Sequence, residues 1–123
     1  MPLSADDIAL LQEPQLAHLA TVSPDGRPQV TPVWIDTDGE AVLFNTAKGR
    51  VKHRNIVKNP WVAVSVADRN DFYRTLWVRG RAEIVEDGAD AHIDKLAKKY
   101  LGADSYPWRK PEETRVIVRI VPE

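Results

Sequence analysis

A basic segment in the middle of the chain carries the residue types best suited to chemistry. Residues 46–60 contain five cations and no Asp or Glu, whereas the rest of the chain holds 12 Lys and Arg against 18 Asp and Glu. The five cations are Lys48, Arg50, Lys52, Arg54 and Lys58. Such a concentration of positive charge in an otherwise acidic protein indicates either an anion-binding site or a solvated basic surface.

The position of these cations favours an anion among them. Residues 51–58 are expected to form about two helical turns, which Pro60 ends. Lys48, Arg50 and Lys52 then lie at the start of this helix, where free N–H groups and the helix dipole already place positive charge. Cations there cost a few tenths of a kcal/mol each, roughly. A bound phosphate would offset that cost, although a solvated basic helix face explains the pattern equally well.

The remaining residue types offer weaker signals. His18, His53 and His92 show no metal-ligand spacing, so we expect structural or surface histidines and no metal site. The chain contains no cysteine, no phosphate-binding glycine loop and no serine nucleophile elbow. Neither a metal centre nor a catalytic triad is therefore predicted.

Two aromatic residues could face a ligand. Trp34 follows Pro32 and Val33 on a predicted strand that faces the basic segment, where it could form an apolar wall beside a phosphate. Tyr73, in a polar connection, is expected to be exposed, and it could equally be a loop anchor.

Alternating apolar residues predict six strands and three helices. The strands are expected at residues 15–22, 28–36, 41–47, 61–68, 75–87 and 114–123, and the helices at 5–12, 51–58 and 88–102. Ser4 is the expected N-cap of the first helix. Gly80 suggests a bulge or bend in the fifth strand. The first three strands are expected to form a meander, because turn residues separate them.

This pattern predicts a mainly β protein formed by one domain over residues 1–123. Six strands with little helix favour a closed or nearly closed antiparallel barrel, although a sandwich would show the same alternation. No apolar run is long enough to span a bilayer, and the N-terminus lacks a basic, apolar signal sequence. We therefore expect a cytoplasmic protein. The formal net charge of −1 argues against a general nucleic-acid binder.

Several short motifs in one order resemble a known family. They are D-G-R-P at 25–28, P-V-W at 32–34, F-N-T-A-K-G-R-V-K at 44–52 and R-N-I-V-K-N-P at 54–60. In this order and spacing they resemble the pyridoxamine 5'-phosphate oxidase-like, FMN-binding split-barrel superfamily. Within it the chain looks most like the small F420-dependent oxidoreductases. The resemblance covers residues 16–86 well and the last strand loosely.

The resemblance implies a six-stranded antiparallel split β-barrel with short flanking helices. It also implies a homodimer with a cofactor at the interface, its phosphate near the helix that follows the basic loop and its ring along the second strand. Tyr73 would approach from the partner subunit. The implied cofactor-binding residues are Pro32, Val33, Trp34, Asn45, Thr46, Lys48, Gly49, Arg50, Lys52 and Tyr73.

Two departures separate the chain from true pyridoxamine 5'-phosphate oxidases. Those enzymes place an Arg for the FMN phosphate on the second strand, where this chain has apolar Val30 or its neighbour. They also carry an Arg- and Trp-rich C-terminal segment, which is absent before Glu123. The resemblance therefore implies F420 as the cofactor, with FMN as the alternative, and not the vitamin-oxidase activity.

Three functions remain open on these grounds. The first is hydride transfer from reduced deazaflavin to a small organic acceptor, with a proton from solvent or from Tyr73; the sequence does not name the acceptor. The second is a non-catalytic carrier of flavin or deazaflavin. The third is single-stranded nucleic-acid binding through the basic loop and Trp34, which the acidic remainder of the chain disfavours.

Overall fold

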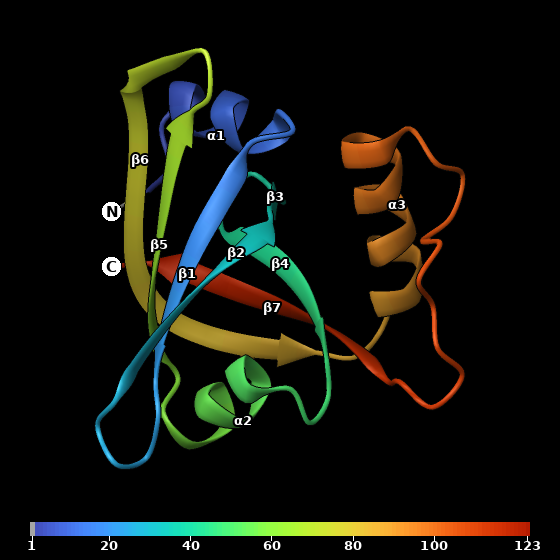
Figure 1. Ribbon diagram of the computed structural model, residues 1–123. Helices are drawn as coiled ribbons and strands as arrows, with labels where there is room; N and C mark the ends of the chain where they lie inside the picture. The colour runs from blue at the N-terminus through green and yellow to red at the C-terminus, as the bar shows by residue number, and fades with distance from the viewer. Residues whose placement is uncertain (1) are drawn as a thin grey trace.

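One antiparallel sheet of seven strands forms the centre of the computed structural model, which describes residues 2–123. The sheet curls into a half-barrel (Figure 1), in the order β2-β1-β5-β6-β7-β4-β3. The strands are β1 Leu16–Val22, β2 Pro28–Trp34, β3 Asp36–Thr37, β4 Val42–Ala47, β5 Trp61–Asp68, β6 Asp71–Val85 and β7 Arg115–Pro122. The mainly β, split-barrel fold class is thus confirmed, and the short β3 is an addition to the six predicted strands.

Three helices surround the sheet at the predicted places. They are α1 Ala5–Gln12, α2 Val51–Lys58 and α3 Ala89–Leu101. Ser4 is the N-cap of α1, and its hydroxyl and the carboxylate of Asp7 form a reciprocal capping box. Figure 1 shows α1 and α2 at opposite ends of the curled sheet and α3 beside it. No helix of residues 2–123 has the length and apolar character needed to cross a membrane.

The predicted meander of the first three strands is wrong. β2 pairs with β1, but β4 pairs with β3 and β7, so β2 and β4 are not neighbours in the sheet. Pro28 and Pro32 explain the outcome, because proline cannot donate to a second strand and belongs at an edge. The half-barrel therefore remains split, with β2 at one edge and β3 at the other.

β6 is longer than predicted and bends as it passes from β5 to β7. It begins at Asp71, so most of the predicted polar connection at 69–74 is strand and only a tight turn joins it to β5. At Gly80 the backbones of β6 and β7 approach so closely that an added Cβ would lie 2.0 Å from the carbonyl oxygen of Val121. The predicted bend at Gly80 is thus explained by a backbone contact that only glycine permits.

The barrel interior is apolar and leaves one end of β4 for polar residues. Phe44, Val116 and Val118 point into the core and are fully buried. The opposite face of β4 and β7 carries Asn45 and lies under α3. The cavity therefore lies where the apolar interior of the barrel gives way to polar residues at the end of β4.

Candidate functional site

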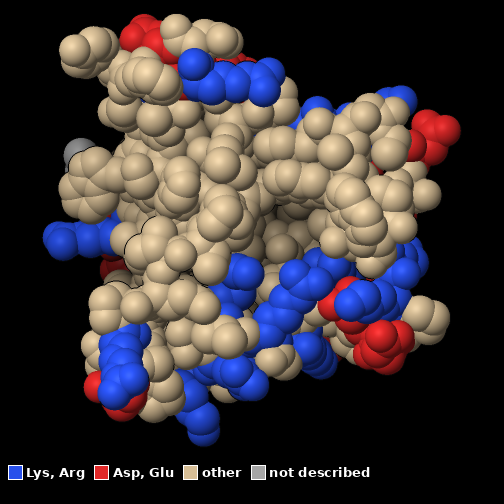
Figure 2. Space-filling model, viewed as in Figure 1, with Lys and Arg blue, Asp and Glu red and all other residues tan. Residues whose placement is uncertain are grey.

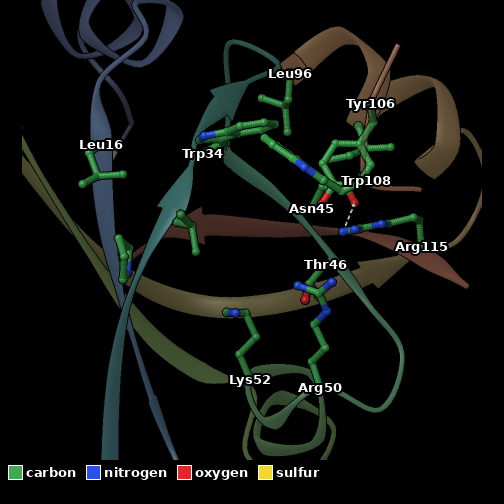
Figure 3. Close-up of a pocket in the computed structure, with 13 residues that line it drawn as sticks. Leu16, Trp34, Asn45, Thr46, Arg50, Lys52, Leu96, Tyr106, Trp108 and Arg115 are labelled. Atoms are coloured by element: carbon green, nitrogen blue, oxygen red, sulfur yellow. Dashed lines mark hydrogen bonds between the residues drawn. The ribbon is translucent and has the colours of Figure 1, made fainter. Parts of the chain in front are cut away.

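A cavity of about 340 Å³ opens where the edge strand β2, the end of β4, the start of α2 and the inner face of α3 meet. Figure 2 shows it as a hollow with Lys and Arg side chains along one rim. Figure 3 shows Arg50 and Lys52 rising from α2 below Thr46, with Trp34 at the opposite end. The cavity therefore has a cationic end and an aromatic end.

Most of the predicted site residues line this cavity. Seven of the ten are brought together: Pro32, Val33, Trp34, Asn45, Thr46, Arg50 and Lys52. They come from three separate elements, so the fold joins residues that the sequence separates by up to 20 positions.

Three predicted residues lie outside the cavity lining of the single chain. Lys48 forms an ion pair with Glu86 instead. Gly49 has φ +89° and donates its N–H to Nδ1 of His53. Tyr73 lies at the start of β6 with 97% of its surface exposed. Lys48 and Gly49 thus do not line the cavity of the single chain, whereas the approach of Tyr73 from the partner subunit stays a prediction.

Sequence reasoning missed the part of the lining that the start of β1, α3, the following loop and β7 contribute. These residues are Leu16, Ile93, Leu96, Tyr106, Trp108 and Arg115. Arg115 carried a partial signal, because it shares one face of the last strand with the apolar Ile117 and Val121, although Arg119 lies on that face as well. A cation on such a face requires a partner or a ligand.

The cationic end of the cavity brings like charges together. Arg50 donates to Glu113 at 2.8 Å, and Arg115 is 7% exposed. Burial and the nearby charges of Arg50 and Arg115 lower the pKa of Lys52. Lys52 forms no ion pair within residues 2–123. This end is therefore electrostatically incomplete, and an anion would relieve the repulsion.

An unpartnered hydroxyl lies at the same end. Thr46 is 1% exposed, and within the described chain its Oγ1 has no hydrogen-bond partner. Arg50 is the N-cap of α2 and makes no side-chain capping bond, and the first turn of α2 holds no acidic residue. A buried donor beside cations and a helix N-terminus matches an oxygen-rich anion such as phosphate.

The aromatic end is rigid. Trp34 stacks on Tyr100, with ring centroids 5.1 Å apart, and meets the edge of Tyr106 at 6.2 Å. Tyr106 is held by its own N–H bond to Asp94 at 2.8 Å and by the guanidinium of Arg115, 4.8 Å over its ring. The aromatic wall is thus fixed before any ligand binds, which suits a flat ring.

A buried polar network lies between the cavity and α3. Nδ2 of Asn45 contacts Nδ1 of His92 at 3.2 Å, and Nε2 of His92 contacts Asp36 at 3.1 Å. Burial would raise the pKa of Asp36, but hydrogen bonds from His92, the Thr37 backbone and Lys95 outweigh it and hold that pKa at about 2. His92 is therefore a structural histidine, as predicted for the three histidines. Within residues 2–123 no cluster of His, Asp and Glu could hold a metal ion.

A split barrel with a cavity that is cationic at one end and aromatic at the other is the class that the fold and the cavity define. The sequence model of the pyridoxamine 5'-phosphate oxidase family matches residues 7–123, and the chain belongs to this family. The family assignment confirms the resemblance that the motifs of the second to fourth strands carried.

Individual relatives agree with this assignment. The chain is 25% identical over 117 residues to a pyridoxine/pyridoxamine 5'-phosphate oxidase of Bacteroides thetaiotaomicron, covering 94% of this chain and 48% of that protein. The chain thus spans about half the length of this curated relative.

Two solved structures extend the comparison. One, a protein named F420 reductase, is 43% identical, with a TM-score of 0.81 over 94% of this chain and 91% of the other. The other, a single-residue variant of HupZ from Group A Streptococcus, is 25% identical, with a TM-score of 0.64 over 98% and 96% of the two chains. Relatives named as oxidases and reductases make oxidoreductase the class of function that the family supports.

Proposed function

We propose that the protein is an oxidoreductase that uses the deazaflavin F420 and delivers a hydride to a small organic acceptor. FMN is the alternative cofactor. The observation that carries the proposal is a cavity with an incomplete cationic end and a rigid aromatic end. At one end Lys52 has a lowered pKa and the Thr46 hydroxyl has no partner within the described chain, and at the other end lies Trp34. A ligand that joins a flat ring to a phosphate would place its phosphate at the cationic end and its ring at the aromatic end of the cavity.

The residues present fit such a cofactor. Arg50 and Lys52 would neutralise the phosphate, and the Thr46 hydroxyl would donate to one of its oxygens. Pro32, Val33 and Trp34 would support the ring and exclude water from one of its faces. When bound, F420 or FMN supplies the hydride chemistry itself, so the protein need only bind, orient and shield.

Two observations favour F420 over FMN. The relative named F420 reductase is 43% identical and matches nearly the whole chain. Arg54 and Lys58 also lie exposed on α2, outside the cavity, where the carboxylates of a longer anionic tail could meet them. FMN has no such tail, so these two cations would have no cofactor partner with FMN.

We propose that the protein works as a homodimer. The outer face of β1, β5 and β6 exposes large apolar side chains, among them Leu16, Trp61 and Trp77. Such a surface is typical of an interface between subunits. Tyr73 of the partner subunit would then approach the site, and this arrangement accounts for the exposed position of Tyr73 in the single chain.

Titration of the purified protein with F420 and with FMN tests the cofactor. Arg50→Ala and Lys52→Ala should each weaken binding by about 1–3 kcal/mol. Lys98→Ala is the matched control, because it removes the same charge from an exposed position on α3 outside the cavity. Equal affinity of wild type and the Arg50→Ala/Lys52→Ala double variant would contradict the phosphate site.

A second measurement separates an enzyme from a carrier. Reduced deazaflavin bound to the protein is mixed with quinones, enones and biliverdin, and its re-oxidation is followed by absorbance. An enzyme should accelerate re-oxidation by at least one acceptor over the rate with free cofactor. Tight binding without acceleration by any acceptor would favour the carrier.

A further inference from the structure

The side-chain amide of Asn45 has only one orientation that its neighbours allow. Its Nδ2 donates to the carbonyl oxygen of Ala89 at 2.9 Å, and a carbonyl can only accept. Its Oδ1 faces Nη1 of Arg115 at 3.5 Å, and a guanidinium can only donate. The amide nitrogen therefore faces α3, and the amide oxygen faces Arg115 and the cavity.

This orientation also determines the tautomer of His92. The second hydrogen on Nδ2 of Asn45 points to Nδ1 of His92, so Nδ1 accepts. The proton of the imidazole then lies on Nε2, which donates to Asp36 at 3.1 Å. Lys95 donates to the same carboxylate at 3.0 Å and holds it in place. The Ala89 carbonyl and His92, which Asp36 holds in this tautomer, keep both amide hydrogens of Asn45 away from the cavity.

Arg115 stacks over the ring of Tyr106 but is buried without a close hydrogen-bond partner. Its two side-chain hydrogen bonds, to Asn45 and to Glu113, both measure 3.5 Å, although only 7% of the residue is exposed. Glu113 bonds Arg50 at 2.8 Å instead. A buried guanidinium held at the limit of hydrogen-bond distance has donors left for a ligand.

The cavity thus presents an acceptor and a donor side by side: Oδ1 of Asn45 and the guanidinium of Arg115. An anion would meet the Asn45 oxygen unfavourably, so this place differs from the phosphate site at Lys52. A cyclic amide or imide edge, in which an N–H adjoins a C=O, satisfies both groups. The N–H would donate to Asn45, and the C=O would accept from Arg115.

We propose that Asn45 and Arg115 form a recognition site for the pyrimidinedione edge of the cofactor ring, and that His92 is a positioning residue that keeps the Asn45 oxygen toward it. FMN and F420 both carry this edge, an N3–H flanked by two carbonyls. The inference rests on the proposed function but does not depend on which of the two cofactors is used.

Methylation of N3 tests the proposal on the wild-type protein. FMN and 3-methyl-FMN are titrated by isothermal calorimetry, and so are the 8-hydroxy-5-deazaflavin cofactor and its N3-methyl analogue. Methylation should weaken binding of the preferred cofactor about 10-fold or more, since the site is left with an unpaired acceptor. Parent cofactors that fail to bind would overturn the proposed function and this site together. A parent that binds no better than its methyl analogue would overturn this site alone.

Substitutions show which residues discriminate the parent cofactor from its N3-methyl analogue. In Asn45→Ala the affinity ratio of parent to methyl analogue should fall to about 1, because the acceptor is gone and there is room for the methyl group. His92→Leu removes the acceptor for Nδ2 and should also lower the ratio. His92→Gln, which offers an amide oxygen in its place, should restore much of it. A ratio unchanged by Asn45→Ala would overturn the assignment, and thermal melting of each variant shows whether it is folded.

Discussion

The indole of Trp34 lies parallel to the ring of Tyr100, with 5.1 Å between the ring centroids and 6° between the planes. The Tyr100 hydroxyl donates to the carbonyl of Gln15 at 2.5 Å and accepts the N–H of Ile35 at 2.9 Å. Gln15 precedes β1 and Ile35 follows β2, so one side chain of α3 fixes the end of the β1–β2 pair. The wall of the cavity is thus oriented by a residue outside the cavity.

Tyr100→Phe should destabilise the fold while keeping the stacked ring. The change leaves a buried backbone carbonyl and N–H without their partner, which costs about 1–3 kcal/mol. Urea unfolding followed by tryptophan fluorescence measures this loss. Tyr73→Phe is the matched control, because its hydroxyl is on a residue 97% exposed, and its effect should stay within about 0.5 kcal/mol. Equal stabilities of the two variants would contradict the stabilising role of the hydrogen bonds that the Tyr100 hydroxyl makes.

Lys52→Met should stabilise the ligand-free protein and weaken cofactor binding. Burial and the charges of Arg50 and Arg115 lower the pKa of Lys52, so the charged lysine is less favourable in the folded protein than in the unfolded chain. The gain should be under about 1 kcal/mol, because Lys52 is only partly buried and solvent screens the repulsion.

Urea unfolding at pH 7, with and without cofactor, measures both effects of Lys52→Met. Lys98→Met serves as the control, since Lys98 is exposed on α3 outside the cavity and should change both quantities little. A ligand-free Lys52→Met protein that is less stable than wild type would show that the lysine is structural and not functional.

Much of the fold followed from local patterns. Alternation predicted β1, β4, β5 and β7 almost to the residue, and Ser4, Gly88 and Gly102 mark helix ends as expected. Strand order did not follow, because the pairing of β4 with β7 joins segments about 70 residues apart and no local signal encodes it. Pro28 and Pro32 indicate an edge strand, and the predicted meander is inconsistent with that indication.

The residues of the candidate site were likewise predictable only in part. Arg50, Lys52 and Trp34 were predictable because an unusual charge pattern and an adjacent aromatic residue are visible in one sequence. Tyr106 was not, because the fold of the loop after α3 decides that it reaches the cavity. Arg115 carried only a partial signal, because its place beside the cavity depends on the pairing of β7 with β4. Lys48 lies beside the predicted phosphate residues but pairs with Glu86, a contact across the fold that sequence spacing does not reveal.

Asp36→Asn should remove a contribution to the free energy of unfolding that the wild-type protein has at neutral pH and loses in acid. The pKa of Asp36 is about 2 in the folded protein and 3.8 for an ordinary Asp, so the unfolded chain binds more protons between these values. The contribution of the carboxylate is therefore fully present above about pH 4 and is lost as the pH falls through about 2.

Unfolding free energies between pH 2 and pH 7 check the effect of Asp36→Asn. Wild type should exceed the variant at pH 6, and the difference should shrink between pH 4 and pH 2. Glu112→Gln provides the comparison, because Glu112 is exposed and its substitution should change the stability little. A constant gap between wild type and Asp36→Asn across this range would contradict the assigned pKa.

Gly80→Ala should be strongly destabilising. The added Cβ would lie 2.0 Å from the carbonyl oxygen of Val121, and backbone cannot move aside cheaply where β6 and β7 are paired. We expect a loss of about 3 kcal/mol or more, at the upper end of overpacking effects. Thermal unfolding measures it against Thr75→Ala, an exposed position on the same strand that should change little. A Gly80→Ala protein as stable as Thr75→Ala would show that the two strands can separate without cost.

Trp77→Glu should convert the proposed homodimer into monomers. Trp77 is 68% exposed on β6, beside the other large apolar side chains of that face, and a carboxylate there would be buried unpaired in a subunit interface. Sedimentation velocity at micromolar concentration should show a wild-type dimer and a monomeric Trp77→Glu. Val57→Glu is the control, because Val57 is 57% exposed on α2, away from this face, and should leave the dimer intact.

If Tyr73 of the partner subunit completes the site, monomeric Trp77→Glu should also bind the cofactor more weakly. Wild type that sediments as a monomer while it binds cofactor with full affinity would contradict both the interface and the role of Tyr73.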